Sequence, residues 1–249
     1  MIAVASLWRH PIKSHGREAL HSVTLTAGEA FPWDRRWAVT HDATKHEGDG
    51  WSACRNFMIG TLTPRLAGLW ARLDPEGPAV HLEHADLGEM QVAPDDPASV
   101  AAFLDWVAPL SADGSLKPTG LVSAGPRGMT DTRYPSVSIM NTASHTAVAD
   151  ALGGVLEPER WRGNIWLDGL APWAEWDWIG QRIRIGGARL DVVERIQRCK
   201  HTMAHPVTGE RDADTLGTLN GQFGHQDFGV YAVVIAGGPV ALGDTAEVI

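Results

Sequence analysis

Cysteine is scarce in this sequence, and its scarcity narrows the possible chemistry. The 249 residues include two cysteines, Cys54 and Cys199. Two thiols cannot ligate an iron–sulfur cluster of the four-cysteine kind, and they cannot form a framework of several disulfides. One disulfide between them is compatible with the sequence. Because no targeting signal is evident, we expect both to be free thiols in a reducing compartment.

Long apolar runs and a leading positive charge are also missing. The segment 1–8 is too short for the apolar region of a signal peptide, and no run approaches the roughly 20 apolar residues that span a bilayer. We therefore expect a cytoplasmic protein with no membrane partner.

Positive charge is in deficit, since the formal net charge is -9. A surface of that sign repels nucleic acid and anionic membranes, so we expect neither as a general partner. A small anionic ligand is still compatible, because a few convergent arginines can hold a phosphate inside an acidic protein. The sequence also has no glycine-rich dinucleotide fingerprint, Walker loop or hydrolase elbow.

The patterns that are present favour a mainly β protein with a few helices, in the α+β class. Short β-rich runs alternate with Gly, Pro and Asp. A hairpin is predicted over 181–192 with Gly186-Gly187 at its turn. Near the end of the chain we predict a strand over 230–235, a turn at 237–239 and a return strand from Val240. Helices are predicted after a cap at Asp96, over about 143–152, and near 212–219.

The stretch from Pro94 to Pro118 separates two β-rich parts of the chain. It holds the first predicted helix together with several Pro, Asp, Gly and Ser residues. We therefore predict two domains, one over 1–115 that includes the linker helix and one over 116–249.

Cys199 lies in the sequence Arg198-Cys199-Lys200-His201. The thiolate form of cysteine binds metals and attacks electrophiles, and nearby cations favour that form. On a strand the side chains of Arg198 and Lys200 would point away from Cys199, so spacing alone does not assign a role. A free cysteine can equally serve as a small buried apolar residue.

The residues around Cys199 resemble the signature of the molybdenum cofactor sulfurase C-terminal (MOSC) family. In that family an Arg-Cys pair ends a strand and a Pro-x-Thr-Gly turn follows, which here is Pro206-Val-Thr-Gly209. Three more stretches resemble family strands in order and spacing: Arg160-Trp-Arg-Gly-Asn-Ile165, Phe228-Gly-Val-Tyr231 and Gly238-Pro-Val-Ala-Leu-Gly-Asp244.

The first half of the chain extends the resemblance. Trp8-Arg-His-Pro-Ile-Lys-Ser14 and the strand-like Phe31-Pro-Trp-Asp-Arg-Arg-Trp-Ala-Val39 are similar to the β-barrel domain that often precedes MOSC. The resemblance implies two β-barrel-like units with the cofactor between them. It extends to family members such as the mitochondrial amidoxime-reducing component and its bacterial counterparts.

One stretch departs from the family pattern. Where the family has Thr-Ala-Arg-Gln, this chain has Ser52-Ala-Cys-Arg-Asn56. Arg55 takes the place of the family arginine if one residue is inserted. Cys54 would then lie near the site or pack beside it, and we assign it no role.

The resemblance implies a molybdenum cofactor, a pterin dithiolene that carries a terminal phosphate. Cys199 would be the catalytic residue and the thiolate ligand of the metal, since a soft ligand suits such metals. Lys13, Ser14 and Arg36 suit the phosphate, with Arg35 the competing choice. Arg162 and Asn164 are two residues apart, so on a strand they would face one side and hold the pterin. The remaining predicted cofactor-binding residues are Arg55, Arg198 and Tyr231.

The function that this resemblance implies is an oxidoreductase that reduces N-hydroxylated or N-oxide small molecules. With no flavin fingerprint and too few cysteines for a cluster, the electrons must come from a separate flavin or iron–sulfur protein. The alternative is a sulfur carrier, in which Cys199 holds a persulfide for metal–sulfur or cofactor biosynthesis. A third is a module that stores the cofactor without turnover.

Two other groups of residues have competing explanations. Cys199, His201 and His205 could form a zinc site, but the Pro206 turn argues against a helix there and no fourth ligand is evident. Trp173, Trp176 and Trp178 favour packing of a long loop, and an aromatic wall at a substrate pocket is the alternative.

Overall fold

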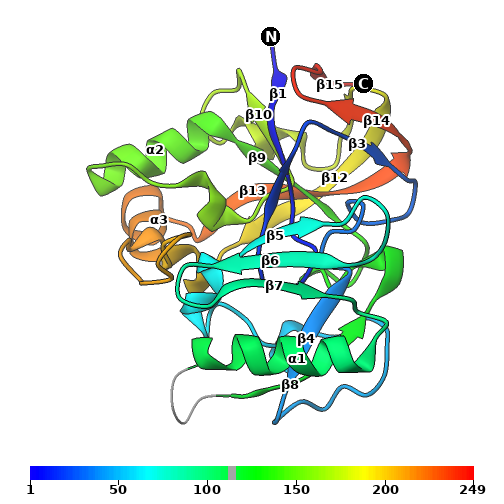
Figure 1. The fold of residues 1–249 in the computed structure, drawn as a ribbon. Helices are drawn as coiled ribbons and strands as arrows, with labels where there is room; N and C mark the ends of the chain where they lie inside the picture. The colour runs from blue at the N-terminus through cyan, green and yellow to red at the C-terminus, as the bar shows by residue number, and fades with distance from the viewer. Residues whose placement is uncertain (112–115) are drawn as a thin grey trace.

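The computed structural model describes residues 1–111 and 116–249, and it is dominated by β-strands. Figure 1 shows the two ends of the chain close together at one pole, with α1 at the opposite pole. The mainly β prediction with a few helices is therefore confirmed.

The largest sheet has eight strands in the order β15-β11-β12-β13-β9-β10-β1-β2. All neighbours are antiparallel except β9 and β10, which run parallel. The predicted hairpin is confirmed as β11 and β12, and Gly186 has a φ of +52 at its turn, which favours glycine. The strands span Ala3–Arg9 (β1), Glu18–Leu20 (β2), Val137–Asn141 (β9), Ile165–Asp168 (β10), Arg182–Ile185 (β11), Ala188–Gln197 (β12), Asp227–Ala236 (β13) and Ala246–Val248 (β15).

Three smaller sheets complete the described β structure. They pair β14 with β3, β4 with β8, and β5 with β6 and β7. The return strand predicted from Val240 begins earlier and does not return along β13. Its residues Gly238–Ala241 instead pair with β3, and the lack of a side chain at Gly237 permits this approach, since a Cβ there would lie 2.5 Å from the Leu25 carbonyl oxygen. The strands span Ser22–Leu25 (β3), Trp37–His41 (β4), Trp70–Leu73 (β5), Val80–His84 (β6), Gly88–Val92 (β7), Pro118–Ser123 (β8) and Gly238–Ala241 (β14).

Three α-helices lie in the described part of the chain, near the predicted positions. Helix α1 (Pro97–Val107) begins where Asp96 accepts a hydrogen bond from the Ala98 amide at 3.0 Å. Helix α2 (Thr142–Leu152) ends at Gly153, which is left-handed. Helix α3 (Thr215–Phe223) starts later than predicted, because Asp214 rather than Asp212 caps it.

Short 3₁₀ helices connect many strands and carry several residues of the site. They span Cys54–Asn56 (η1), Pro64–Gly68 (η2), Ala108–Leu110 (η3), Gly125–Arg127 (η4), Pro158–Trp161 (η5), Ala174–Trp178 (η6) and Lys200–Met203 (η7).

The described residues form four buried apolar clusters, and the two largest are the main cores. The larger lies along the eight-stranded sheet and includes Leu7, Ile139 and Val230. The second lies between α1 and the small sheets and includes Phe103 and Leu82. Burial of these side chains supplies the main favourable term in folding.

The sheets exchange strands across the predicted domain boundary. Strand β1 lies between β10 and β2, whereas β8 pairs with β4. The predicted boundary falls beside residue 115, which lies outside the described residues. No helix among the described residues is long and apolar enough to cross a membrane.

Candidate functional site

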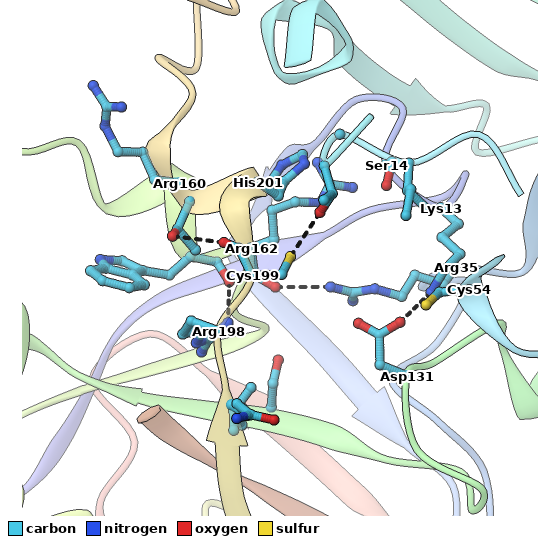
Figure 2. A pocket seen from close by; sticks show the side chains of 18 of the residues that line it. Lys13, Ser14, Arg35, Cys54, Asp131, Arg160, Arg162, Arg198, Cys199 and His201 are labelled. Atoms are coloured by element: carbon cyan, nitrogen blue, oxygen red, sulfur yellow. Dashed lines mark hydrogen bonds and ion pairs between the residues drawn. The ribbon is translucent and has the colours of Figure 1, made fainter. Parts of the chain in front are cut away.

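A cavity of about 380 Å³ brings together segments that are far apart in the sequence (Figure 2). Its walls come from the loops after β1 and before β4, from η1 and the segment 59–61, from η5, and from the end of β12 with η7. Among the residues that line it, five have cationic side chains and one has a carboxylate: Lys13, Arg35, Arg160, Arg162, Arg198 and Asp131. The guanidinium of Arg160 points away from Cys199 in Figure 2 and pairs with Glu157 and Asp212. A protein of net charge -9 thus has a cationic cavity.

Cys199 lies on the cavity wall just after β12 ends at Gln197. It is exposed, and its Sγ accepts a hydrogen bond from the Thr61 hydroxyl at 3.1 Å. The extended backbone at Cys199 precedes η7, so the thiol is presented at a strand-to-helix junction. This is an accessible sulfur rather than a buried apolar side chain.

Arg198 serves as an anchor for that junction. Its guanidinium is buried and donates to the carbonyl oxygens of Trp161, at 2.8 Å, and Phe228, at 2.9 Å from Nε. Burial lowers the pKa of Arg198 to about 10, so it stays charged at neutral pH. Its hydrogen bonds fix the end of β12 against η5 and β13. Lys200, by contrast, is exposed and does not line the cavity.

Arg162 is the cation in the cavity wall that has the fewest partners. It is 9% exposed, and in the described structure its guanidinium forms no hydrogen bond or ion pair, with Nη2 fully buried and unpartnered. Burial, followed by the nearby charge of Arg35, lowers the pKa of Arg162 to about 9. A buried charge without a partner is costly, so this position favours an anionic ligand.

The predicted strand over 160–165 is wrong in its first part. Arg162 is left-handed, with φ 50°, and follows η5, whereas β10 begins only at Ile165. Arg162 and Asn164 therefore do not share one face of a strand. The segment Pro158–Trp161 turns because proline starts a 3₁₀ helix there.

The side chain of Asn164 forms its hydrogen bonds with the protein rather than pointing them into the main cavity. Its Oδ1 accepts from the Ser138 amide at 3.1 Å and the Ser138 hydroxyl at 2.8 Å, and its Nδ2 donates to the Trp8 carbonyl at 3.2 Å. It lines a small neighbouring cavity that shares Arg35 and Tyr231 with the main one. Asn164 thus connects the ends of β1, β9 and β10 behind the site.

Lys13 and Ser14 line the cavity, but the ammonium of Lys13 is already paired. It is buried and donates to the Met129 carbonyl at 2.8 Å and to Asp131 Oδ1 at 2.6 Å. The side chain of Asp131 is 57% exposed, and although partial desolvation opposes ionisation, the charge of Lys13, with those of Arg35 and Arg198, lowers the pKa of Asp131. The pair is therefore ionised, and one ammonium proton of Lys13 remains available to a ligand.

The structure places Arg35, not Arg36, in the cavity wall. Both residues precede β4, and Arg35 is left-handed with φ 49°, which turns its side chain inward. Its guanidinium donates to the Arg162 carbonyl at 3.0 Å and pairs with the buried Asp34. Arg36 instead stacks over Trp33, 4.3 Å from the ring centroid, and does not line the cavity.

Asp34 and His10 form a buried support beneath Arg35. Asp34 Oδ1 accepts from the His10 amide at 2.7 Å and lies 2.9 Å from His10 Nδ1. Burial, with the nearby charge of Arg162, lowers the pKa of His10 to about 3, so the ring is neutral. Despite its burial, the charge of Arg35 and the His10 contact hold the pKa of Asp34 well below its usual range.

The two remaining predicted residues differ in position. Arg55 is exposed and does not line the cavity; its neighbour Cys54 does. Burial, and then the charge of Asp131, raises the pKa of the Cys54 thiol. Tyr231 on β13 lines the cavity, and burial raises the pKa of its hydroxyl.

The zinc alternative lacks the geometry that it needs. Of its histidines, His201 lines the cavity, whereas His205 lies 3.4 Å from Glu157. Residues 1–111 and 116–249 contain no group of three His, Cys, Asp or Glu side chains placed to hold a metal ion.

The tryptophan cluster belongs to the packing of the molecule. Trp173 lies 5.0 Å from both Trp176 and Phe223 between ring centroids, and neither Trp173, Trp176 nor Trp178 lines the cavity.

Sequence reasoning missed several wall residues. Thr61 and Asp131 carry no motif that would single them out, and Arg160, although it begins the stretch Arg160-Trp-Arg-Gly-Asn-Ile165, has no predicted role. Gly60 is the wall residue whose type reflects its position, because it has no side chain and a Cβ there would lie 1.6 Å from His201 Nδ1. The close contact of Gly60 with His201 brings Thr61 to Cys199.

Comparisons with known proteins assign both halves of the chain. The family model described as MOSC N-terminal beta barrel domain matches residues 1–105, and the MOSC domain model matches residues 130–247. Among solved structures, YuaD from Bacillus subtilis is 15% identical to this chain, with a TM-score of 0.47. The match covers 100% of this chain and 96% of the YuaD chain. YiiM from Geobacillus stearothermophilus is 19% identical, with a TM-score of 0.36, and the match covers 45% of this chain and 53% of the YiiM chain. No curated protein matches the chain.

Proposed function

Because this chain belongs to the MOSC family and carries the MOSC N-terminal β-barrel domain, we propose that its cationic cavity binds the molybdenum cofactor. Cys199 is the proposed thiolate ligand of the metal. The proposed reaction is reduction of an N-hydroxylated or N-oxide compound. Two electrons and two protons convert N–OH into N–H and water, or an N-oxide into the free amine and water. A separate flavin or iron–sulfur protein supplies the electrons.

The observation that carries the proposal is the buried, unpartnered guanidinium of Arg162 in the same cavity as the exposed thiol of Cys199. The first group suits an anion, and the second suits a soft metal. A pterin dithiolene with a terminal phosphate joins these two requirements in one molecule. The residues present therefore fit the group.

Different residues of the cavity are proposed to bind different parts of the cofactor. Lys13, Ser14 and Arg35 suit the phosphate, with Arg35 replacing Arg36 in this role. Arg162, the cation without a partner in the described structure, offers its donors to the anionic part of the cofactor, and Tyr231 offers a hydrogen-bond donor to the pterin. Asn164 acts behind the site by holding Ser138 in place.

The bound cofactor supplies a metal that undergoes a two-electron redox change. The protein would hold that chemistry in a cavity whose β12 side is lined by the buried Ile196 and Thr202. The Thr61 hydroxyl, which donates to Cys199 Sγ, orients the sulfur in the cavity wall.

Metal analysis combined with a cysteine exchange tests the proposal. Protein made in a host that synthesises the cofactor should contain molybdenum and releasable pterin in near-equal amounts. In Cys199→Ser the hydroxyl is a poor soft ligand, so reduction of an N-hydroxylated amidine by reduced methyl viologen should fall at least about a hundredfold. Pterin should remain partly bound.

Cys54→Ser is the matched control, because it alters the other thiol of the same cavity. It should keep most of the activity. Full activity in the loaded Cys199→Ser protein would exclude the ligand role. If wild-type protein has no reductase activity when loaded but accepts labelled sulfur from a cysteine desulfurase on Cys199, it is a sulfur carrier instead.

A further inference from the structure

The outer rim of the cavity carries exposed side chains that the site itself does not use. Arg55 directly follows the wall residue Cys54, and Lys200 directly follows Cys199. Arg211 is placed at the same rim, because its Nη2 donates to the Thr61 carbonyl at 2.6 Å. Leu62, next to Thr61, is 56% exposed. We refer to Arg55, Leu62, Lys200 and Arg211 as the rim patch.

The charges of the rim patch are left uncompensated. Elsewhere the exposed arginines 65, 182 and 184 each pair with a carboxylate, whereas the exposed arginines 72, 133 and 189 do not pair with any described residue, so the position beside Cys199 is what distinguishes the rim patch. Within the described chain, none of the three rim cations has a carboxylate within 4.0 Å.

Two carboxylates beside the rim are already paired with other cations. Asp131, which lines the cavity, pairs with Lys13, and Asp212, which follows Arg211 in the chain, pairs with Arg160. The rim patch therefore presents three cations without an ion-pair partner among the described residues, on a protein whose net charge is -9.

We propose that the rim patch is the docking surface for an acidic electron-donor protein. This inference rests on the proposed reductase function. Electrons have to arrive close to Cys199, and Cys199 is exposed at this face. A donor docked over the rim therefore has the shortest route to the site.

The chemistry of the patch favours a protein over an extended polyanion. The overall negative charge of the chain repels a nucleic acid or an anionic membrane beyond the rim itself. A compact acidic protein contacts only the rim, where Leu62 supplies the apolar contact that interfaces add to charge.

The number of electrons per turnover determines how large and how long-lived the contact with the donor can be. Each turnover takes two electrons from the donor and two protons from solvent, and it releases the amine and water. A one-electron donor must dock twice per turnover, so a small contact steered by charge and released quickly fits the task.

The probe is an acidic plant-type [2Fe–2S] ferredoxin, used as reductant for the loaded holoprotein. Ferredoxin-driven kcat/KM should fall as salt rises, because screening weakens the steering. In Arg55→Glu/Lys200→Glu it should fall at least about tenfold at low salt. Activity with reduced methyl viologen and the pterin content should stay within about twofold, since Arg55 and Lys200 do not line the cavity.

Arg189→Glu is the matched control, because Arg189 is exposed at the start of β12, the end of that strand away from Cys199. It should leave ferredoxin-driven kcat/KM nearly unchanged. An equal loss in Arg189→Glu, or no loss in the double variant, would overturn the docking site. So would binding of wild-type protein to phosphatidylserine vesicles or RNA in preference to ferredoxin.

Titration of ferredoxin against the holoprotein separates this inference from the proposed function. If viologen-driven reduction fails while ferredoxin still binds wild-type protein and not the double variant, the reductase proposal is wrong and the docking surface stands. If reduction succeeds and ferredoxin does not bind at low salt, the docking surface is wrong.

Discussion

Arg35 and Arg36 are adjacent in the chain yet serve different parts of the molecule. Arg35 compensates the buried charge of Asp34 and reaches the cavity, whereas Arg36 covers Trp33. The sequence shows both as equal candidates. The left-handed backbone at Arg35, which decides between them, is rare for a residue with a side chain and has no signal in composition.

Exchange of each arginine for glutamine separates their contributions. Arg35→Gln leaves Asp34 buried without its cation and should lower the free energy of unfolding by about 3 kcal/mol, with loss of cofactor retention. Arg36→Gln removes one stacked cation and should cost about 0.5–1 kcal/mol. Urea unfolding and pterin content measure both. Equal costs for the two variants would contradict the assignment.

His10 makes the stability of the fold depend on pH. Its pKa in the folded protein is about 3, mainly because it is buried, whereas an unfolded histidine titrates near 6.5. The unfolded chain therefore binds this proton more readily, and stability falls as the pH decreases from 6.5 towards 3. The loss should be on the order of a few kcal/mol, and burial lowers the pKa of His15 to about 4, which adds to it.

Unfolding free energies between about pH 4 and 7 test this pH dependence. His10→Asn should flatten the slope, because no group at position 10 then takes up the proton. His21→Asn, at an exposed histidine, should keep the wild-type slope. A slope unaltered by His10→Asn would assign the acid sensitivity elsewhere.

At the scale of elements, the contact of segment 59–61 with η7 governs access to Cys199. A Cβ on Gly60 would overlap His201, so Gly60→Ala must push these two elements apart. Overpacking of this kind costs about 1–3 kcal/mol. The Thr61 hydroxyl should move away from Cys199, and in a Cys54→Ser background the thiol should react with a disulfide reagent at a changed rate.

Gly154→Ala provides the comparison for this test, because nothing lies within 4 Å of a Cβ at that position. It should leave both stability and the reactivity of Cys199 unaltered. A Gly60→Ala protein with wild-type reactivity would show that Thr61 does not control the thiol.

The elements show which features of the fold the sequence predicts. Turn and cap residues located the hairpin at Gly186-Gly187 and the helix after Asp96, because these signals act over a few residues. The partner of β14 was missed, since pairing with β3 depends on contacts more than 200 residues apart. Arg162 was placed on a strand because a family motif fixes residue types and not backbone angles.

The sequence predicts those parts of the candidate site whose residues belong to family motifs. Lys13, Ser14, Arg162, Cys199 and Tyr231 line the cavity, and their proposed roles stay predictions. The partners that orient them, such as Asp131 and Thr61, come from segments without a motif. Their positions follow from packing alone.

At the scale of the whole molecule, the halves interlock through β1 and β8. Strand β1 completes the sheet of the second half, and β8 pairs with β4 of the first half. We expect residues 1–111 and 116–249, made as separate chains, to be unfolded or aggregated alone. Co-expression should restore a soluble complex.

The intact chain should accordingly unfold in one transition. Calorimetric and van't Hoff enthalpies should agree, because neither core is complete without a strand from the other half. Two resolved transitions, or a folded 116–249 fragment, would show that the halves are independent.

The position of β1 has a consequence for synthesis on the ribosome. One neighbour, β2, follows at once, but the other, β10, begins at Ile165. At about 5–20 residues per second, the apolar side of β1 waits roughly 8–30 s for that partner. During this interval Val4 and Leu7, which are buried in the finished protein, are open to chaperones. The nascent chain should therefore depend on holding factors more than a protein with sequential sheets.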